Sequence, residues 1–360
     1  MTGGLRIRKD LVHWLVPLVG LAGWVVLGHA GGLVAALVMV GLLLTCVVTA
    51  VHHAEVVAHR VGEPFGTLVL TLSVTVIEVA LIVSMMLHGD PNPELVRDTI
   101  HATVILVLHG VAGLCIVAGT LRHREQEFST AGANAFLTVL IPMVVLVLVL
   151  PNYTTSVPGP YYTPVQMVFV AVVCVTLYAA FLFVQTVRHK DFFLARIDQP
   201  RTAEQDAAPL YKAWLAFGML VLTLCAVVLL AEALAPFIED SILQSGAPAK
   251  LAGVIVAMIV LMPETATAFQ AARRNRLQTS INLALGSGLA SIGLTVPVVV
   301  VVATWIGHPL ALGTDAGSTV LLLLTFAMAM LTYGQGRTNL LSGFVHLVLL
   351  GFYFFLMFAP

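Results

Sequence analysis

The chain has 360 residues, of which 59% are hydrophobic and only 10% are charged, and its mean hydropathy is +1.00. Soluble domains are about 45–50% apolar and about 25% charged, so this composition excludes a soluble globular protein and a disordered chain. A formal net charge of −1 also argues against a nucleic-acid-binding protein. A transporter, a channel and an intramembrane enzyme remain open.

Long apolar stretches predict an all-α polytopic membrane protein, because a membrane-spanning helix needs about 20 apolar residues. Transmembrane β-strands are shorter and alternate in polarity, which these stretches do not. The first helix follows the polar start MTGGLRIRKD without a small-residue cleavage site, so we expect a signal anchor. Eleven helices are predicted, over residues 11–29, 33–54, 64–88, 97–121, 131–150, 164–187, 210–236, 250–272, 278–305, 317–334 and 338–358.

The positions of the basic residues predict the orientation of these helices, because Lys and Arg collect in cytoplasmic loops. With the N-terminus inside, only Arg97 and Lys250 of the 17 lysines and arginines lie in outside segments. A missed or extra helix would invert every later loop and destroy this segregation. We therefore expect a multi-pass protein of the cytoplasmic (inner) membrane, with the N-terminus in the cytoplasm and the C-terminus outside.

A charged segment near the middle of the chain divides the helices into two groups. With the first helix set aside, five helices precede this segment and five follow it. Two five-helix units in series have opposite orientations, an arrangement common in secondary transporters. The expected organisation is an N-terminal helix (1–30), a first five-helix repeat (31–188), a cytoplasmic linker (189–209) and a second five-helix repeat (210–360).

Two acidic residues lie deep within predicted helices. Glu78 and Glu264 each lie about fourteen residues from a helix start, in the second helix of each five-helix unit. A charged carboxylate at the bilayer centre costs about 2.5–3.5 kcal/mol on insertion scales, so such groups face a polar cavity or a partner. A protonated acid satisfied inside the helix bundle is the structural alternative. Two acids in corresponding helices favour a cation or proton site.

Polar residues accompany both acids. Thr71, Thr75 and Glu78 are spaced four and three residues apart and share a helix face. Pro263 precedes Glu264 and leaves a carbonyl one turn earlier without its helical donor, which predicts either a broken helix or a simple kink. Candidate supporting ligands for a cation are Thr71, Thr75, Asn282, Ser287 and Ser291.

Histidines supply two further candidates. His109 lies deep in its helix and is a candidate proton relay, with a hydrogen-bonded structural role as the alternative. His52, Glu55 and His59 share one face at the cytoplasmic end of the second helix. This face is a candidate for pH sensing, and a solvated helix end is the simpler interpretation.

Two carboxylates at a shared site would bind either protons or a cation, because cation ligands must be deprotonated. Ca²⁺ prefers roughly 6–8 oxygen ligands, of which two carboxylates supply at most about four. This competition is an antiport mechanism that needs no resident cofactor, and the cargo would be Ca²⁺, Na⁺ or K⁺ together with protons. The chain contains no GxxxxGK[ST] segment, which argues against an ATP-driven pump.

Two segments resemble the signature regions of the cation/proton exchanger family, in the calcium/cation antiporter superfamily. They are HHAEVVAHRVGEPFGTLVLTLSVTVIEVALI and MPETATAFQAARRNRLQTSINLALGSGLASIGLTVPVV. The bacterial calcium (sodium, potassium)/proton antiporter branch is the most similar, and RHREQEF, YGQGRTN and VQTVRHKDFF also resemble it. The resemblance covers nearly the whole chain.

The resemblance implies one N-terminal helix and two inverted five-helix repeats. It implies that Glu78 and Glu264 alternate between protons and a cation, with Asn282 and Gly286-Ser287 beside the site. The sequence departs from the family, because Thr75-Val76-Ile77 and Leu261-Met262-Pro263 stand where many exchangers have Gly-Asn-Ala, and Ala290 stands where many have Gln. Fewer side-chain oxygens keep monovalent cations in contention. We expect a secondary Ca²⁺/H⁺ antiporter, with a Na⁺(K⁺)/H⁺ antiporter, a channel and an intramembrane metal-dependent enzyme as alternatives.

Overall fold

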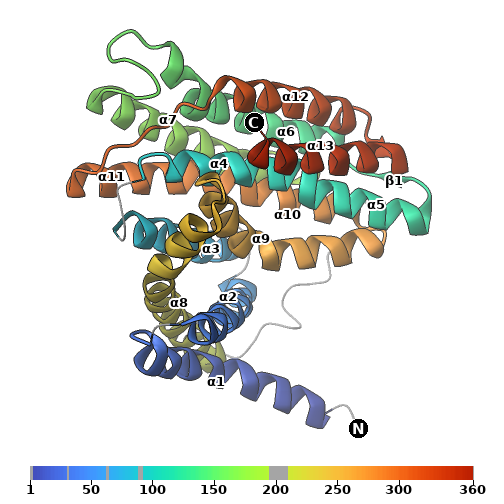
Figure 1. Cartoon of the computed structure of the whole chain (residues 1–360). Coiled ribbons are helices and arrows are strands. Elements are labelled where there is room, and N and C mark those ends of the chain that lie inside the picture. Colours follow the sequence, from blue (N-terminus) through green and yellow to red (C-terminus); the bar gives the residue numbers. More distant parts are fainter. Residues whose placement is uncertain (1–2, 31, 62–64, 88–91, 194–209, 360) are drawn as a thin grey trace. The chain divides into compact units, whose positions relative to one another are not determined.

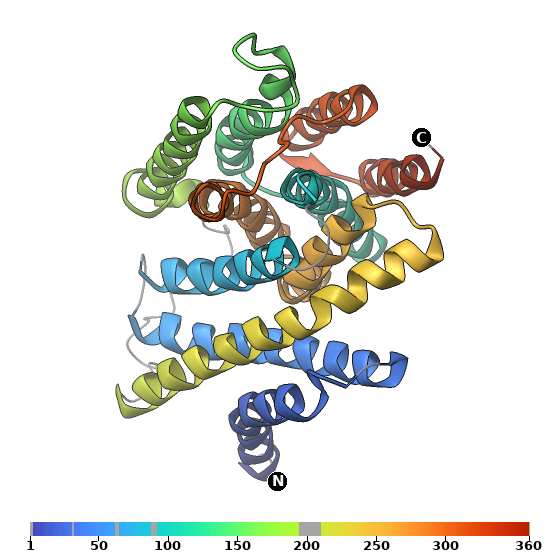
Figure 2. The same ribbon diagram turned by 60° about the vertical axis from the view of Figure 1, so that its left-hand side comes forward.

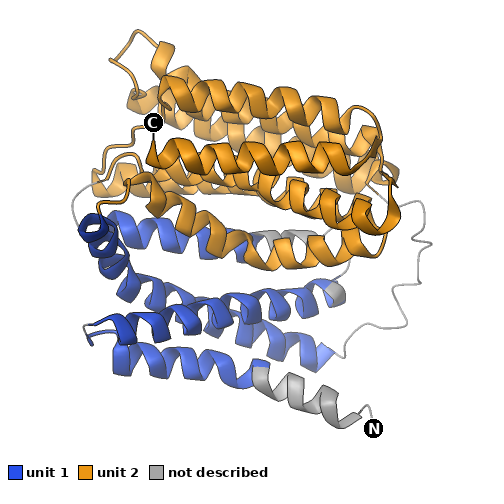
Figure 3. Ribbon diagram, turned by 45° about the vertical axis from the view of Figure 1, so that its right-hand side comes forward, with its two compact units in different colours: residues 1–91, 200–245 blue, residues 92–199, 246–360 orange. Residues whose placement is uncertain are grey.

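The computed structural model describes residues 3–30, 32–61, 65–87, 92–193 and 210–359, and it is predominantly helical (Figure 1). The chain forms two compact units (Figure 3). Unit 1 comprises residues 1–91 and 200–245, and unit 2 comprises residues 92–199 and 246–360. Each unit therefore combines segments from both predicted five-helix repeats.

Unit 1 consists of four described helices: α1 (Gly3–Leu27), α2 (Leu33–Val61), α3 (Phe65–Leu87) and α8 (Leu210–Ser245). Helices α2 and α8 pack along one another, and α1 and α3 each contact both of them (Figure 2). Gly20 of α1 permits close approach, since a Cβ there would lie 2.6 Å from Cys46 Sγ and 3.3 Å from Ala226 Cβ. Small residues at such crossings are typical of packed membrane helices.

Unit 2 contains the remaining helices and two short strands. Its elements are α4 (Leu95–Ile105), η1 (Leu106–Val111), α5 (Ala112–His123), β1 (Gln126–Glu127), α6 (Thr130–Val144), η2 (Val145–Val149), η3 (Leu150–Tyr153), α7 (Pro164–Phe183), η4 (Val184–Arg188), η5 (Lys190–Phe192), α9 (Lys250–Arg273), α10 (Leu277–Ala290), η6 (Ser291–Thr295), α11 (Val296–Ile306), α12 (Ala316–Tyr333), β2 (Arg337–Thr338) and α13 (Leu340–Phe358). Helix α9 packs against α4, α5 and α10, while α13 packs against α5 and η1. Helix α9 therefore has neighbours from both predicted repeats.

Local sequence determines where several of these helices begin. Ser129 accepts a hydrogen bond from the Gly132 amide at the start of α6, and Thr163 forms a capping box with Gln166 at the start of α7. Asp315 and Asn339 cap α12 and α13 in the same way. Each oxygen satisfies a backbone N–H that the first turn leaves without a helical partner.

By length and composition, nine described helices could each span a membrane, and His13–Leu27 and Leu72–Leu87 are shorter apolar helices within the described residues. These helices lie near the ranges expected from the sequence, although several boundaries differ. Helix α8 continues through Pro236 to Ser245 instead of ending at residue 236. Proline is tolerated inside membrane helices because neighbouring groups satisfy the carbonyl that it leaves without a donor.

Two of the long predicted helices are interrupted in the middle. The predicted helix over 97–121 contains the π-helical turn η1, and the helix over 278–305 contains the π-helical turn η6. Single π turns inside α-helices occur frequently at functional sites. These two interrupted helices contact each other, because a Cβ on Gly288 of α10 would lie 3.3 Å from a Val107 methyl of η1.

Loops far apart in the sequence pair in unit 2. Strands β1 and β2 are antiparallel, with Gln126 opposite Thr338 and Glu127 opposite Arg337. A separate antiparallel bridge joins Tyr161 to Ala311. The predicted orientation places the first pair of loops on the inside and the second pair on the outside, so each pairing joins loops assigned to the same side.

Candidate functional site

The two predicted acidic residues lie in different units. Glu78 belongs to α3 of unit 1 and is buried, with 1% of its surface exposed. Glu264 belongs to α9 of unit 2 and is half-buried.

Helix α9 passes through Pro263 without a break. The proline has no N–H to donate to the carbonyl of Ile259, one turn earlier. Thr265 and Thr267 donate their hydroxyl hydrogens to the carbonyls of Leu261 and Pro263, at 2.6 and 3.0 Å. Of the two sequence interpretations, a continuous helix lacking one internal bond agrees with this geometry, and a broken helix does not.

The predicted hydroxyl ligands lie on the helices that the sequence assigned. Thr75 of α3 is buried, whereas the side chain of Thr71 lies outside the described residues. Ser287 of α10 is half-buried, and Ser291, which opens the π turn η6, is buried. Ser287 and Ser291 are four residues apart, and Ser291 begins the interrupted part of this helix.

Asn282 has both ends of its side-chain amide engaged within unit 2. Its Nδ2 donates to the carbonyl oxygen of Phe193 at 2.6 Å, and its Oδ1 accepts from Gln278 Nε2 at 2.8 Å. Gln278 Oε1 in turn accepts from the Ser129 backbone amide at 2.5 Å. This chain joins α10 to the start of α6 and to the residue after η5, so Asn282 serves as a connector in this conformation.

His109 belongs to a buried group of polar side chains that sequence reasoning only half identified. Its Nδ1 lies 2.8 Å from Nδ1 of His346, and its Nε2 lies 2.9 Å from the Thr325 hydroxyl. Nε2 of His346 lies 2.9 Å from the Thr332 hydroxyl. The sequence alone does not single out His346, which lies 237 positions from its partner. Its only signal was a histidine within an apolar helix.

Hydroxyl geometry determines the direction of these hydrogen bonds. Thr325 donates its single hydrogen to the Leu321 carbonyl at 2.7 Å, so it accepts from His109 Nε2. Neutral His109 then accepts at Nδ1 from His346, whose Nε2 accepts from Thr332. The chain of hydrogen bonds is complete with both imidazoles neutral. Both ring nitrogens of His109 are directed to α12 and α13, and its role as a relay stays a prediction.

A second group of histidines lies between α1 and α2 in unit 1. The rings of His13 and His52 stack with centroids 4.1 Å apart, and His53 Nε2 lies 3.1 Å from the His13 carbonyl oxygen. Glu55 lies one turn after His52 on α2, whereas the side chain of His59 is outside the described residues. The sequence had not singled out His13, because only tertiary packing brings α1 against this face.

Charged groups gather at the N-terminal ends of α4, α9 and α12. The buried Arg97 guanidinium donates to Glu94 at 2.7 Å, to Asp98 at 2.9 Å and to the Gly313 carbonyl at 3.3 Å. Lys250 pairs with Asp315 at 2.6 Å. Burial alone would raise the pKa of Asp315, but the Lys250 ammonium and the Ser318 donors hold it below the usual range for a carboxyl group. These groups therefore join helix ends.

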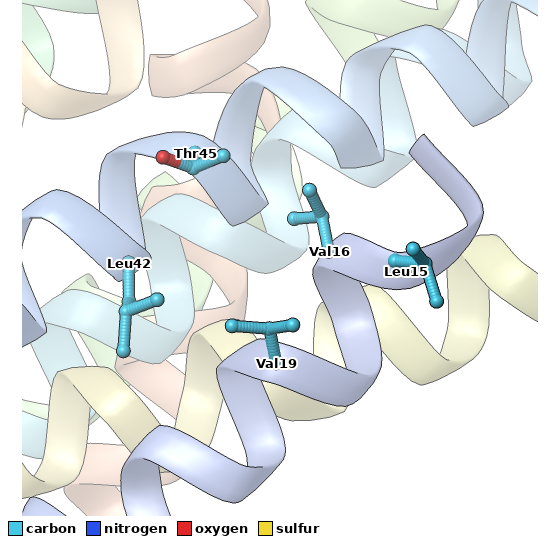
Figure 4. Close-up of a pocket in the computed structure, with 5 residues that line it drawn as sticks. All are labelled: Leu15, Val16, Val19, Leu42 and Thr45. Carbon is cyan, nitrogen blue, oxygen red and sulfur yellow. The ribbon is translucent and has the colours of Figure 1, made fainter. Parts of the chain in front are cut away.

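A small pocket in unit 1 has no acidic lining. Leu15, Val16 and Val19 of α1 and Leu42 and Thr45 of α2 surround it (Figure 4). One hydroxyl among four apolar side chains offers too few oxygens for a cation. Within the described residues, no group of three or more His, Cys, Asp or Glu side chains forms a metal site.

Comparison with known proteins decides the family. The family model for sodium/calcium exchanger proteins matches residues 29–187 and 215–359. The chain belongs to this family. This exchanger is a multi-pass membrane protein and a secondary transporter rather than an enzyme, and the family and its relatives support cation/proton antiport.

The similarity to three known proteins covers most of this exchanger. The y4hA protein of Sinorhizobium fredii is 44% identical over 371 residues, covering 100% of both chains. The sodium-potassium/proton antiporter ChaA of Escherichia coli is 33% identical, and the similarity covers 90% of this chain and 88% of ChaA. The solved structure of native YfkE superposes with a TM-score of 0.75 at 18% identity, covering 97% of this chain and 100% of YfkE. The exchanger therefore shares the YfkE fold.

Proposed function

We propose that this exchanger moves a cytosolic cation out of the cell in exchange for protons, which compete with the cation for Glu78 and Glu264. One observation carries the proposal: each of the two segments that match the family model contains one carboxylate deep in an apolar helix. Thr71, Thr75, Ser287 and Ser291 are the hydroxyls on the same or neighbouring helices that would add oxygen ligands.

Competition follows from the chemistry of carboxylates. Protons neutralise both acids, whereas a cation needs them ionised. Protons arriving from outside would discharge the cation there, and release of those protons inside would make the acids ready for the next cation. The inner membrane of a cell that maintains a proton gradient is the proposed location, with the lipid bilayer as the surrounding partner.

We propose Ca²⁺ as the main cargo, because carboxylate and hydroxyl oxygens are the hard ligands that Ca²⁺ prefers. A Na⁺(K⁺)/H⁺ antiporter is the second candidate. Two observations favour it: the 33% identity to the sodium-potassium/proton antiporter ChaA, and the apolar residues that stand before each acid. A monovalent cation needs fewer charged ligands than Ca²⁺.

An eleven-helix layout with two inverted repeats is part of the proposal. It is supported by the π turn in the third helix of each predicted repeat, η1 and η6. The loop pairings also support it, because β1 with β2 and Tyr161 with Ala311 join the same kinds of loop with the two repeats exchanged. An approximate two-fold axis in the membrane plane would produce both features.

We also propose that the face of His52, Glu55 and His59 senses cytoplasmic pH. Its support is the stacking of His13 on His52, because two stacked imidazoles resist double protonation. Replacing His52 and His59 with Gln should shift the pH optimum of exchange. An unmoved pH profile in sealed vesicles would contradict this role.

Exchange in sealed vesicles tests the main proposal. Ca²⁺, Na⁺ and K⁺ are added separately, and proton movement is followed with a pH-sensitive dye. We expect Glu78→Gln and Glu264→Gln to abolish coupled exchange while the protein remains folded in the membrane. Glu125→Gln is the matched control, because Glu125 lies in an exposed loop beside β1. Normal exchange by either deep-acid variant contradicts the mechanism, and cation conductance without proton movement indicates a channel.

A further inference from the structure

The start of the central linker is held within unit 2 by an aromatic cluster. Phe193 follows η5, and its buried ring packs edge-on against Phe136 of α6 and Phe181 of α7, with centroids 5.5 and 5.8 Å away. Phe136 and Phe181 also contact each other at 4.7 Å. Edge-to-face aromatic packing of this kind fixes both the position and the orientation of a ring.

Asn282 fixes the same residue through the backbone. Its Nδ2–H donates to the Phe193 carbonyl at 2.6 Å, while Gln278 holds the Asn282 oxygen at 2.8 Å. The neighbouring backbone is equally close-packed, since a Cβ on Gly132 would lie 2.4 Å from the Phe192 carbonyl oxygen. Side chain and main chain at residue 193 are therefore held by different elements.

The aromatic cluster reaches the segment that the family resemblance places beside the site. A Cβ on Gly286 would lie 3.7 Å from the ring of Phe136, the ring that supports Phe193. Ser287 is the next residue of α10. A continuous set of contacts thus runs from Asn282 through Phe193 and Phe136 to Gly286 and back to α10, one turn further along the helix.

We infer that Asn282 is a positioning residue rather than a cation ligand, and that it acts through Phe193 and Phe136 on the Gly286–Ser287 segment. Its amide N–H is the group that matters, because that group holds the Phe193 carbonyl. The inference rests on the proposed function, in which Ser287 supplies an oxygen near the path of the cation. It also makes the beginning of the central linker part of the transport machinery.

Substitutions of Asn282 separate the two roles. Asn282→Asp retains an oxygen for a cation but loses the N–H donor and places a carboxylate against the Phe193 carbonyl. A positioning role predicts that Asn282→Asp and Asn282→Ala both lower turnover per folded transporter, about tenfold, since small displacements in a site have large kinetic effects. The apparent KM for the cation should stay within about twofold, because the deep acids are untouched.

Phe193→Ala should produce the same loss of turnover, and combining it with Asn282→Ala should add little, because both changes break one connection. Phe192→Ala is the matched control. Phe192 is 38% exposed and stacks on His189 at 4.7 Å, outside the cluster of Phe136 and Phe181. The control should exchange at the wild-type rate.

The experiment combines vesicle exchange with hydrogen exchange of the peptide that contains Phe192 and Phe193. Their amides bond to the carbonyls of His189 and Lys190, and their exchange should accelerate in Asn282→Ala and Asn282→Asp. Near-wild-type transport by Asn282→Asp together with a raised KM in Asn282→Ala would assign a ligand role and overturn the inference. Additive losses, or unchanged hydrogen exchange, would also overturn it. If the wild-type protein exchanges no cation, the proposed function fails, whereas hydrogen exchange still decides whether Asn282 holds Phe193.

Discussion

The two interrupted helices of unit 2 share a backbone plan but carry different chemistry. Helix α4 leads through η1 into α5, and helix α10 leads through η6 into α11. The first contains His109 in its π turn, bonded to His346 and Thr325, whereas the second opens its π turn with Ser291. The two helices therefore share a π turn in the middle but carry different side chains in that turn.

The starts of the two helices, at α4 and α10, also differ in the groups that bond to them. Arg97 near the start of α4 donates to the Gly313 carbonyl in the loop before α12, and Gln278 near the start of α10 accepts from Ser129 before α6. Each helix is thus joined at its start to a loop of the other predicted repeat, by a charge in one case and by amides in the other. Helix starts in corresponding places of the two predicted repeats are thus joined to loops by different kinds of hydrogen bond.

The largest loss of thermal stability is expected from removing the Arg97 charge near the start of α4. Arg97→Met would leave the buried Asp98 carboxylate without its partner, and losing one member of a buried ion pair costs about 3–5 kcal/mol. The thermal midpoint of the purified protein in detergent should fall strongly. Arg337→Met, which affects an exposed pair with Glu125 at 4.0 Å, should leave it nearly unchanged. Equal midpoints for the two variants would show that the Arg97 cluster does not stabilise the start of α4.

A smaller loss of stability is expected when alanine replaces the glycines at which each interrupted helix packs against a neighbouring helix. A Cβ on Gly293 of η6 would lie 2.7 Å from both Cβ and Cγ of Tyr178, whereas one on Gly113 of α5 would lie 3.0 Å from a Leu347 methyl and 3.1 Å from His346 Cβ. Overpacking typically costs about 1–3 kcal/mol, so Gly293→Ala should destabilise more than Gly113→Ala in thermal unfolding. Gly110→Ala, with its nearest contact at 3.5 Å, is the control. A larger loss of stability in Gly113→Ala than in Gly293→Ala would contradict this prediction.

Replacing either imidazole of the His109–His346 pair should cause a moderate loss of stability. His109→Leu or His346→Leu leaves the remaining imidazole without one hydrogen bond, which costs about 1–2 kcal/mol in a buried site. The double substitution should cost less than the sum, because no half-satisfied imidazole remains. Thermal unfolding of the two single variants and the double variant measures this coupling. Strict additivity would show that the two rings act independently.

The smallest effect is expected for the pair that joins the ends of α9 and α12. Lys250 and Asp315 are 40% and 50% exposed, and exposed ion pairs contribute about 0–1 kcal/mol. Because the pKa of Asp315 is lowered in the folded protein, its contribution is present above the ordinary carboxyl pKa of about 3.9 and is lost as the pH falls through the lowered value. Asp315→Asn should lower the thermal midpoint slightly at pH 7. At strongly acidic pH the difference should disappear, and a larger difference there would contradict the assignment.

Much of the fold was predictable from the sequence. Apolar stretches located the helices, because a span in lipid must be long and must satisfy its own backbone. The π turns η1 and η6 and the continuation of α8 through Pro236 were not predicted, since they depend on how neighbouring helices satisfy backbone groups. The site was predictable to a lesser degree. His109 was identified, but His346 and His13 were not, because they meet their partners only through tertiary packing.

The sequence by itself determined the class of protein, the places of the helices and the two deep acids, because charge scarcity and hydrophobic length are local properties of the chain. Only the tertiary structure decided that Asn282 holds the Phe193 carbonyl, that His109 bonds to His346 and that loops of the two predicted repeats pair crosswise. The reason is physical. A hydrogen bond between residues 89 or 237 positions apart depends on helix packing, and one side-chain pattern along a helix is compatible with many neighbours.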